Sequence, residues 1–228
     1  MDGEIPEIID LIDPSFNCSL DMPYPAQVAG ATGGIVDNTP VVCGGLNSSE
    51  DVVFGGCWGL HDSGSWGPLS EPLDTPRWLA ASGSVVLSNQ LVVAGGQSAS
   101  YLDSIEMVTL YSGTKYLSLT LAIALYNSCI APWDTDTFMI IGGCDNNGCH
   151  KKVTYFVFTN NETITTGPEL KIGRNGHACN EIVVDGQAYV IVAGGESDDA
   201  RWSSEVLSKS SVQLICFMDS LKSNSSLH

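Results

Sequence analysis

The stretch QLVVAGG at residues 90–96 decides the fold, because the chain repeats its pattern of an apolar run that ends in two glycines. The same pattern reads TPVVCGG at 39–45, TFMIIGG at 137–143 and AYVIVAGG at 188–195. The pairs are Gly44 and Gly45, Gly95 and Gly96, Gly142 and Gly143, and Gly194 and Gly195. Their first glycines are 51, 47 and 52 residues apart, and a period near fifty residues indicates a repeat architecture.

Each repeat has the same internal order of apolar runs and turns. A strand-like run precedes each pair, as in LAASGSVVL at 79–87, and a polar turn such as Ser88-Asn89 separates the two runs. A third run follows the pair after a polar loop, for example IEMVTL at 105–110, and three repeats continue to a fourth run. Four strands per repeat predict an all-β propeller of four-stranded antiparallel blades.

This order closely resembles the kelch repeat, whose marks are a glycine pair after an apolar strand, an aromatic residue downstream, a spaced Trp and an Arg that opens the next unit. Trp66 matches the Trp, Arg77 and Arg174 match the Arg, and Tyr155 lies near the aromatic position of the third unit. The resemblance covers residues 25–208 and implies a divergent kelch-type propeller that binds proteins through its loops.

The repeats predict the organisation of the chain. We expect an N-terminal strand or loop at 1–24, units at 25–76, 77–123, 124–173 and 174–208, and a disordered tail at 209–228. Unit four supplies three strands, and residues 4–12 could add its outer strand and close a four-blade ring. We favour an incomplete propeller instead, because kelch-like propellers have six or seven blades. An open array would expose the apolar faces of its end blades and should aggregate or oligomerise.

Charge narrows the classes of partner. The chain has 26 acidic and 9 basic residues among 228, and its net charge is −17. Nucleic acid and anionic membranes are therefore not expected as partners, because phosphate binding needs clustered Lys and Arg. A basic protein partner is expected instead. No apolar run is long enough to span a membrane, and the start MDGEIPEIID lacks the features of a signal peptide.

Eight cysteines predict disulfides rather than a metal site. Cys144 and Cys149 form the first expected pair, a local loop disulfide, because a zinc site built from them with His150 and His177 has no common spacing. His177 is expected to be a packed or hydrogen-bonded histidine beside Arg174.

Two further pairs follow from the expected strands. Cys43 and Cys57 flank one glycine pair on antiparallel neighbours. Cys129 and Cys179 hold equivalent positions in successive inner strands, which allows a bridge between blades or two buried free thiols. Cys18 and Cys216 remain for each other by elimination.

Glycosylation sequons are, besides the cysteines, a second indication of the compartment of the protein. Asn47 and Asn161 lie at loop or turn positions and are the two expected glycan carriers among four sequons. Cysteines and sequons favour an extracellular protein, although this chain shows no signal peptide; a cytoplasmic location is the alternative.

Function is expected to be binding without catalysis. The sequence has no GxSxG, P-loop or HExxH motif, and no cofactor or metal is expected. Candidate contact loops follow the glycine pairs, and one of them presents Arg201 and Trp202, residue types favoured at interfaces. The loops are 46–56, 97–103, 145–151 and 196–202. The alternatives are an intracellular adaptor that presents substrates to a ubiquitin ligase and an extracellular enzyme of the galactose-oxidase kind, for which no copper ligand set is found.

Overall fold

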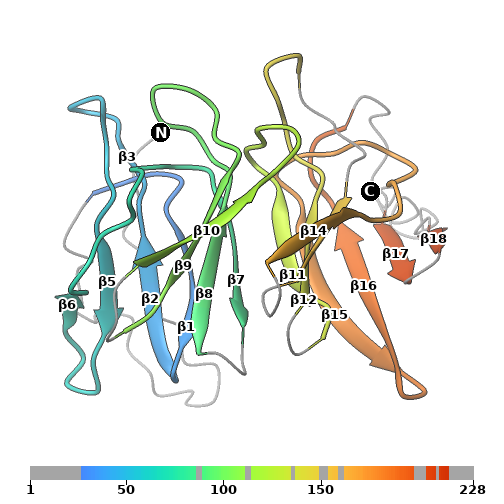
Figure 1. Ribbon diagram of the computed structural model, residues 1–228, viewed down its shortest axis with the longest axis horizontal. Helices are drawn as coiled ribbons and strands as arrows, with labels where there is room; N and C mark the ends of the chain where they lie inside the picture. Colours follow the sequence, from blue (N-terminus) through green and yellow to red (C-terminus); the bar gives the residue numbers. More distant parts are fainter. Residues whose placement is uncertain are drawn as a thin grey trace, which may run out of the picture. The chain divides into compact units, whose positions relative to one another are not determined.

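The computed structural model describes residues 27–85, 89–110, 114–134, 137–148, 154–158, 162–197, 204–208 and 211–215. These residues form four antiparallel four-stranded sheets and one short hairpin (Figure 1). Within the described ranges no helix could cross a membrane. The chain divides into two compact units, Met1–Tyr126 and Asn127–His228, and each holds two of the sheets.

Unit 1 contains sheets 1 and 2, each a succession of antiparallel neighbours. Sheet 1 consists of β1 (Thr32–Val36), β2 (Thr39–Cys43), β5 (Cys57–Leu60) and β6 (Trp66–Pro68). Sheet 2 consists of β7 (Ala81–Val85), β8 (Gln90–Ala94), β9 (Ser104–Val108) and β10 (Thr114–Thr120). A hairpin of β3 (Leu46–Asn47) and β4 (Val52–Val53) interrupts sheet 1.

Unit 2 repeats the plan in sheets 3 and 4. Sheet 3 consists of β11 (Cys129–Pro132), β12 (Thr137–Ile141), β13 (Thr154–Phe158) and β14 (Thr163–Thr166). Sheet 4 consists of β15 (Ala178–Val184), β16 (Gln187–Ala193), β17 (Ser204–Ser208) and β18 (Ser211–Ile215). The four-stranded antiparallel repeat expected around each glycine pair is therefore present four times.

Strand β18 differs from the sequence-based expectation. Its five residues pair with β17 from Ser208↔Ser211 to Ser204↔Ile215, so sheet 4 has its outer strand from the segment predicted to be a tail. The short run SVQLI was missed because it follows the polar residues Lys209-Ser210 and carries no glycine or turn signal. Residues 1–26, including the proposed closing strand at 4–12, and residues 216–228 lie outside the described part.

Two-residue turns join the first two strands in sheets 1 and 4. Asp37 and Asn38 have φ of 46° and 61°, and Asp185 and Gly186 have φ of 51° and 75°. Positive φ at both central residues is the type I′ hairpin geometry, which suits the twist of the flanking strands and favours Asn, Asp and Gly. These polar dipeptides therefore set the strand register.

Each unit has its own apolar core between its two sheets. In unit 1 the cluster includes Val36, Val41, Cys43, Leu91 and Val93. In unit 2 it includes Met139, Ile141, Val190, Val192 and Leu207. Alternate residues along these strands enter the core, because successive side chains of a strand point to opposite faces.

Serines of β7 bind the backbone of β1, which is an edge strand of sheet 1. The Gly33 amide donates to Ser82 Oγ (3.1 Å), and Ser82 Oγ donates to the Gly33 carbonyl (2.8 Å). The Ile35 amide donates to Ser84 Oγ (2.7 Å). Side chains of the neighbouring sheet thus satisfy polar groups that an edge strand otherwise leaves open.

Candidate binding face

The glycine pairs hold each repeat to the start of the next. The second-glycine amides of Gly45, Gly96 and Gly143 donate to the carbonyls of Arg77, Leu125 and Arg174, each at 2.8 Å. All eight glycines have positive φ. A Cβ on Gly44 would collide with the Arg77 carbonyl oxygen, so this junction excludes a side chain as well as requiring glycine's backbone freedom.

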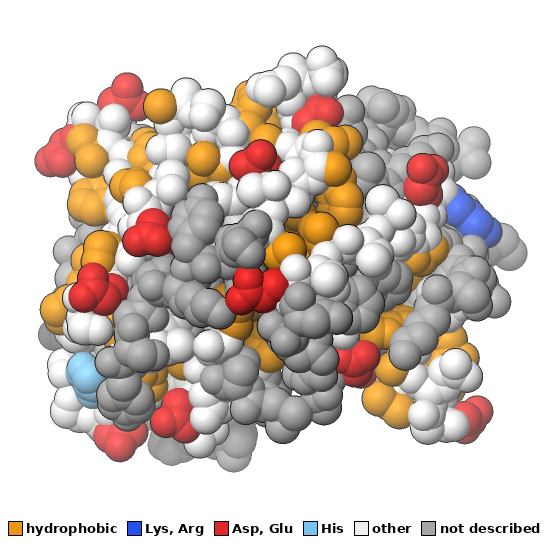
Figure 2. Space-filling model, in the orientation of Figure 1, with side chains coloured by type: hydrophobic (Ala, Val, Ile, Leu, Met, Phe, Trp, Pro, Cys, Tyr) orange, Lys and Arg blue, Asp and Glu red, His pale blue; other side chains and the backbone are white. Residues whose placement is uncertain are grey.

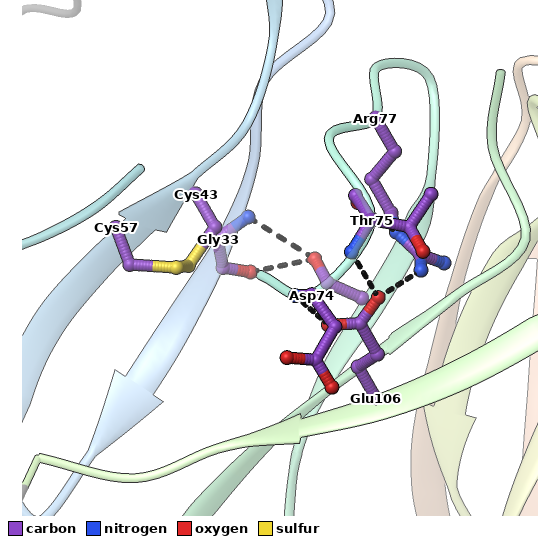
Figure 3. The surroundings of a disulfide bond; sticks show 8 residues. Gly33, Cys43, Cys57, Asp74, Thr75, Arg77 and Glu106 are labelled. Atoms are coloured by element: carbon purple, nitrogen blue, oxygen red, sulfur yellow. Dashed lines mark hydrogen bonds and ion pairs between the residues drawn. A yellow bond between two sulfur atoms is a disulfide. The ribbon is translucent and has the colours of Figure 1, made fainter. Parts of the chain in front are cut away.

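Arg77 is buried at this junction, and its side chain points toward Glu106 of β9 (Figure 3). Its guanidinium donates to the Gly95 carbonyl (2.9 Å), the Ser104 carbonyl (3.2 Å) and Ser104 Oγ (3.0 Å). It also pairs with Glu106, whose side chain has no exposed surface. The Glu106 carboxylate accepts from the amides of Asp74 (2.7 Å) and Thr75 (3.2 Å).

Arg174 repeats this arrangement in unit 2. It donates to the Gly194 carbonyl (2.8 Å) and to Glu205 (2.9 Å). Glu205 accepts from the amides of Lys171 (2.7 Å) and Ile172 (3.1 Å). Both Arg–Glu pairs are fully buried and hydrogen-bonded, which identifies them as structural groups.

The sequence analysis found the two arginines but missed Glu106 and Glu205. The available signal was an acid inside an apolar third strand, because a buried carboxylate needs a partner. The repeat register shows that Trp58, Glu106, Tyr155 and Glu205 occupy one position, each opposite the second residue before a glycine pair. Burial raises the pKa of Tyr155, the residue placed near the aromatic position.

Trp66, the other residue of the kelch-like signature, begins β6 opposite Leu60 and is half-buried. It lies on an outer strand of sheet 1, away from the glycine pairs.

The structure contains two of the expected disulfides. Cys43 and Cys57 lie directly opposite each other on β2 and β5, with 4.1 Å between their Cα atoms. Cys129 and Cys179 join β11 to β15, with 6.1 Å between their Cα atoms. Cys144 is also disulfide-bonded, while Cys149, its expected partner, lies outside the described residues, as do Cys18 and Cys216.

The Cys129–Cys179 bond corrects the expected register by one residue. Cys129 pairs with Ile141, directly before the glycine pair, whereas Cys179 pairs with Val192, one residue earlier. The reason is geometric: equivalent strands turn the same residues to the same side, so side chains that meet between two successive sheets must differ by an odd number of positions.

His177 is packed within unit 2. It precedes β15, and side chains added at Gly142 or Gly195 would collide with it. Burial and the nearby charge of Arg174 lower its pKa to about 4. His177 is therefore neutral at pH 7. Within the described ranges, no three His, Cys, Asp or Glu side chains gather as a metal site would require.

The loops after the first two glycine pairs are ordered by backbone pairing. The first forms the β3–β4 hairpin, where the amide and hydroxyl of Ser49 donate to Asn47 Oδ1 at 3.0 and 2.7 Å. In the second, Gln97 exchanges backbone hydrogen bonds with Trp78 (2.8 and 3.0 Å) and bridges to Tyr101.

The loops after the third and fourth pairs are described in part. Asp145 and Gly148 close a turn by backbone hydrogen bonds of 2.9 and 3.2 Å, and Asp145 Oδ1 accepts from the Asn147 amide (2.8 Å). Glu196 pairs with Asn175 (2.9 and 3.1 Å). Arg201, Trp202 and Asn161 lie outside the described residues.

Three aromatic side chains of unit 1 lie among these loops, and we call Trp78, Tyr101 and Tyr126 the aromatic group. Tyr101 stacks on Tyr126, with ring centroids 4.6 Å apart and planes inclined by 10°. Trp78 and Tyr126 occupy the same repeat position, directly after Arg77 and Leu125. All three are half-buried. The sequence analysis missed this group, whose signal was an aromatic residue after the junction in two successive repeats.

A cavity of about 400 Å³ lies in unit 2 beside the turns that precede β12 and β16. Its lining consists of Trp133, Asp134, Asp185, Gly186, Gln187 and Ala188. These turns lie at the strand ends opposite the glycine pairs, so this cavity is separate from the loops that follow the pairs.

Comparisons with known proteins show the fold and no family. No protein-family model matches the sequence, and no curated protein matches it. Among solved structures, the protein YjhT is similar, with a TM-score of 0.70 and 12% identity over 84% of this chain and 71% of that chain. At this identity the similarity shows a shared fold alone, because one fold hosts many functions.

Proposed function

We propose that this protein is a non-catalytic protein-binding module of the kelch propeller type, which binds through the loops after its glycine pairs. The four sheets with buried Arg77 and Arg174 at their junctions support the kelch-type repeat. The aromatic group carries the proposal of binding. Half-exposed Trp and Tyr offer large contact areas at little cost in side-chain entropy and are enriched at interaction hot spots.

The charge favours a partner with a basic surface. Among the described residues, acidic side chains are spread over the face shown in Figure 2, and the whole chain has a net charge of −17. A field of this sign accelerates the approach of a basic protein and orients it.

An extracellular location belongs to the same proposal. The two disulfides are compatible with an oxidising compartment. The Asn47 sequon lies in the β3–β4 hairpin, whose next residues Ser48, Ser49 and Glu50 are exposed. The intact mass of natively expressed protein, before and after deglycosylation and reduction, tests this location; a reduced, unmodified chain contradicts it.

The binding test compares three forms of the chain as bait for secreted proteins: wild type, Tyr101→Ala and Trp66→Ala. Trp66 is a half-buried aromatic residue of β6, outside the aromatic group, and serves as the matched control. The proposal expects a protein that wild type and Trp66→Ala retain at low salt, that Tyr101→Ala loses, and that salt releases. Equal retention by all three baits contradicts binding through the aromatic group.

A further inference from the structure

The packing of sheets 1 and 2 in unit 1 shows which residues of the repeat are buried when one sheet covers another. Sheet 1 packs on sheet 2 through Val36, Val41, Cys43 and Cys57, of which at most 2% is exposed. Sheet 2 contributes Leu91, Val93 and Val108, of which at most 1% is exposed. One repeat thus offers one face and the next repeat offers the other.

In sheet 4 the described residues leave the first of these faces uncovered. Counting from the glycine pairs, Val36, Val41 and Cys43 correspond to Ile182, Ile191 and Ala193. These three residues are only half-buried, and Val184, next on the same face, is 48% exposed. Ser204, at the position of Cys57, remains buried.

The opposite face of sheet 4 is buried normally. Val190, Val192 and Leu207 have no exposed surface and pack within the core of unit 2. Sheet 4 therefore has one covered and one open apolar face, and we call the side with Ile182, Val184, Tyr189 and Ile191 the sheet 4 open face.

In sheet 1 the other of the two apolar faces is the exposed one. Its residues Pro40, Val42 and Leu60 correspond to Leu91, Val93 and Val108 of sheet 2. They are half-buried, and Ile35 on the same side is 51% exposed. We call this side, with Ile35, Pro40, Val42 and Leu60, the sheet 1 open face.

We propose that the sheet 4 open face of one copy of this protein binds the sheet 1 open face of a second copy, head to tail. The sheet 4 open face corresponds to the side of sheet 1 that packs on sheet 2, and the sheet 1 open face corresponds to the side of sheet 2 that packs on sheet 1. Two such faces therefore already pack together within unit 1. Neither named set contains a charged residue, so these side chains can meet without burying a charge of their own, although the net charge of the chain is −17. Different faces on the two subunits make the association heterologous, able to form chains or a closed ring.

Complementary blocking tests this geometry. Val184→Asp places a charge on the sheet 4 open face and Ile35→Asp on the sheet 1 open face, where burying an unpaired carboxylate opposes association. Val52→Asp is the matched control, because Val52 is 44% exposed on β4, outside both faces. Light scattering with size-exclusion chromatography gives the mass, and circular dichroism checks that each variant is folded.

The expected result is specific to head-to-tail binding. Wild type and Val52→Asp exceed the 24.1 kDa of one chain as concentration rises, and each blocked variant stays at this mass. A mixture of the two blocked variants then forms a dimer and nothing larger, because only one productive pair of faces remains. A monomeric wild type overturns the proposal. A dimeric Ile35→Asp alone also overturns it, because sheet 4 would then bind sheet 4.

Discussion

At the scale of single residues, the buried Arg–Glu pairs are structural groups and are not part of the proposed binding site. The other two repeats carry apolar and aromatic residues at the same positions: Val28 with Trp58, and Leu125 with Tyr155. The repeat therefore accepts either a charged pair or an uncharged one. Well-packed apolar replacements of a buried ion pair are often neutral or stabilising, whereas removing one partner alone leaves a buried charge.

Removing one charge from the Arg77–Glu106 pair should destabilise the protein more than removing both. Glu106→Gln is expected to cost about 3–5 kcal/mol, because it leaves the buried guanidinium uncompensated. Arg77→Leu with Glu106→Tyr copies the uncharged pair of the third repeat and should cost less. Urea unfolding measures both; a double variant less stable than Glu106→Gln contradicts this account.

His177 should make stability depend on pH in mild acid. Its folded pKa of about 4 lies below the ordinary value of 6.5, so between these values the unfolded chain binds the extra proton. The contribution is complete above pH 6.5 and is lost as the pH falls toward 4, at up to about 1.4 kcal/mol per pH unit. His177→Gln should flatten this part of the curve of unfolding free energy against pH. Gln187→Asn, at an exposed position, is the control; it changes no titratable group and should leave the slope unchanged.

At the scale of strands and sheets, exposure distinguishes the two disulfides. Cys43 and Cys57 are at most 2% exposed within the core of unit 1, whereas Cys129 and Cys179 are half-buried. Reduction requires a thiolate to reach a sulfur atom. A mild reductant under native conditions should therefore open Cys129–Cys179 first. Alkylation followed by peptide mass analysis reports the order, and earlier labelling of Cys43 and Cys57 would show that the core of unit 1 opens more readily.

The strands were predictable where the signal is local. An apolar run, a polar turn and a glycine pair occur close together along the sequence. The sequence therefore predicts the hairpin that the first two strands of each sheet form. The β3–β4 hairpin was missed because its strands have two residues each, and β18 was missed because it lacks this pattern. The pairing of Arg77 with Glu106 depends on the register of β8 and β9, and the Cys129–Cys179 offset depends on which faces of two sheets meet. Neither register nor facing is visible in one sequence without the fold.

The candidate site was predictable only as a region. The glycine pairs indicated which loops share one end of the strands, because equivalent turns of a repeat lie at equivalent strand ends. Trp78 and Tyr126 carry a repeat signal that was overlooked. Tyr101 was missed because it belongs to a different segment from Tyr126, and a stack across 25 residues has no periodic signature. Arg201 and Trp202, chosen for their residue types, lie outside the described part and stay predictions.

At the scale of the whole molecule, net charge gives the two proposed contacts opposite responses to salt. Two copies that each carry −17 repel at long range, so screening should strengthen self-association through the apolar open faces. A basic partner is attracted by the same charge, so screening should weaken its binding to the aromatic group. Sedimentation measured from about 20 to about 300 mM NaCl, where the Debye length falls from about 20 to about 6 Å, should show association between copies rising as partner binding falls. Self-association that weakens with salt would mean that charged groups, rather than the apolar faces of sheets 1 and 4, hold the copies together.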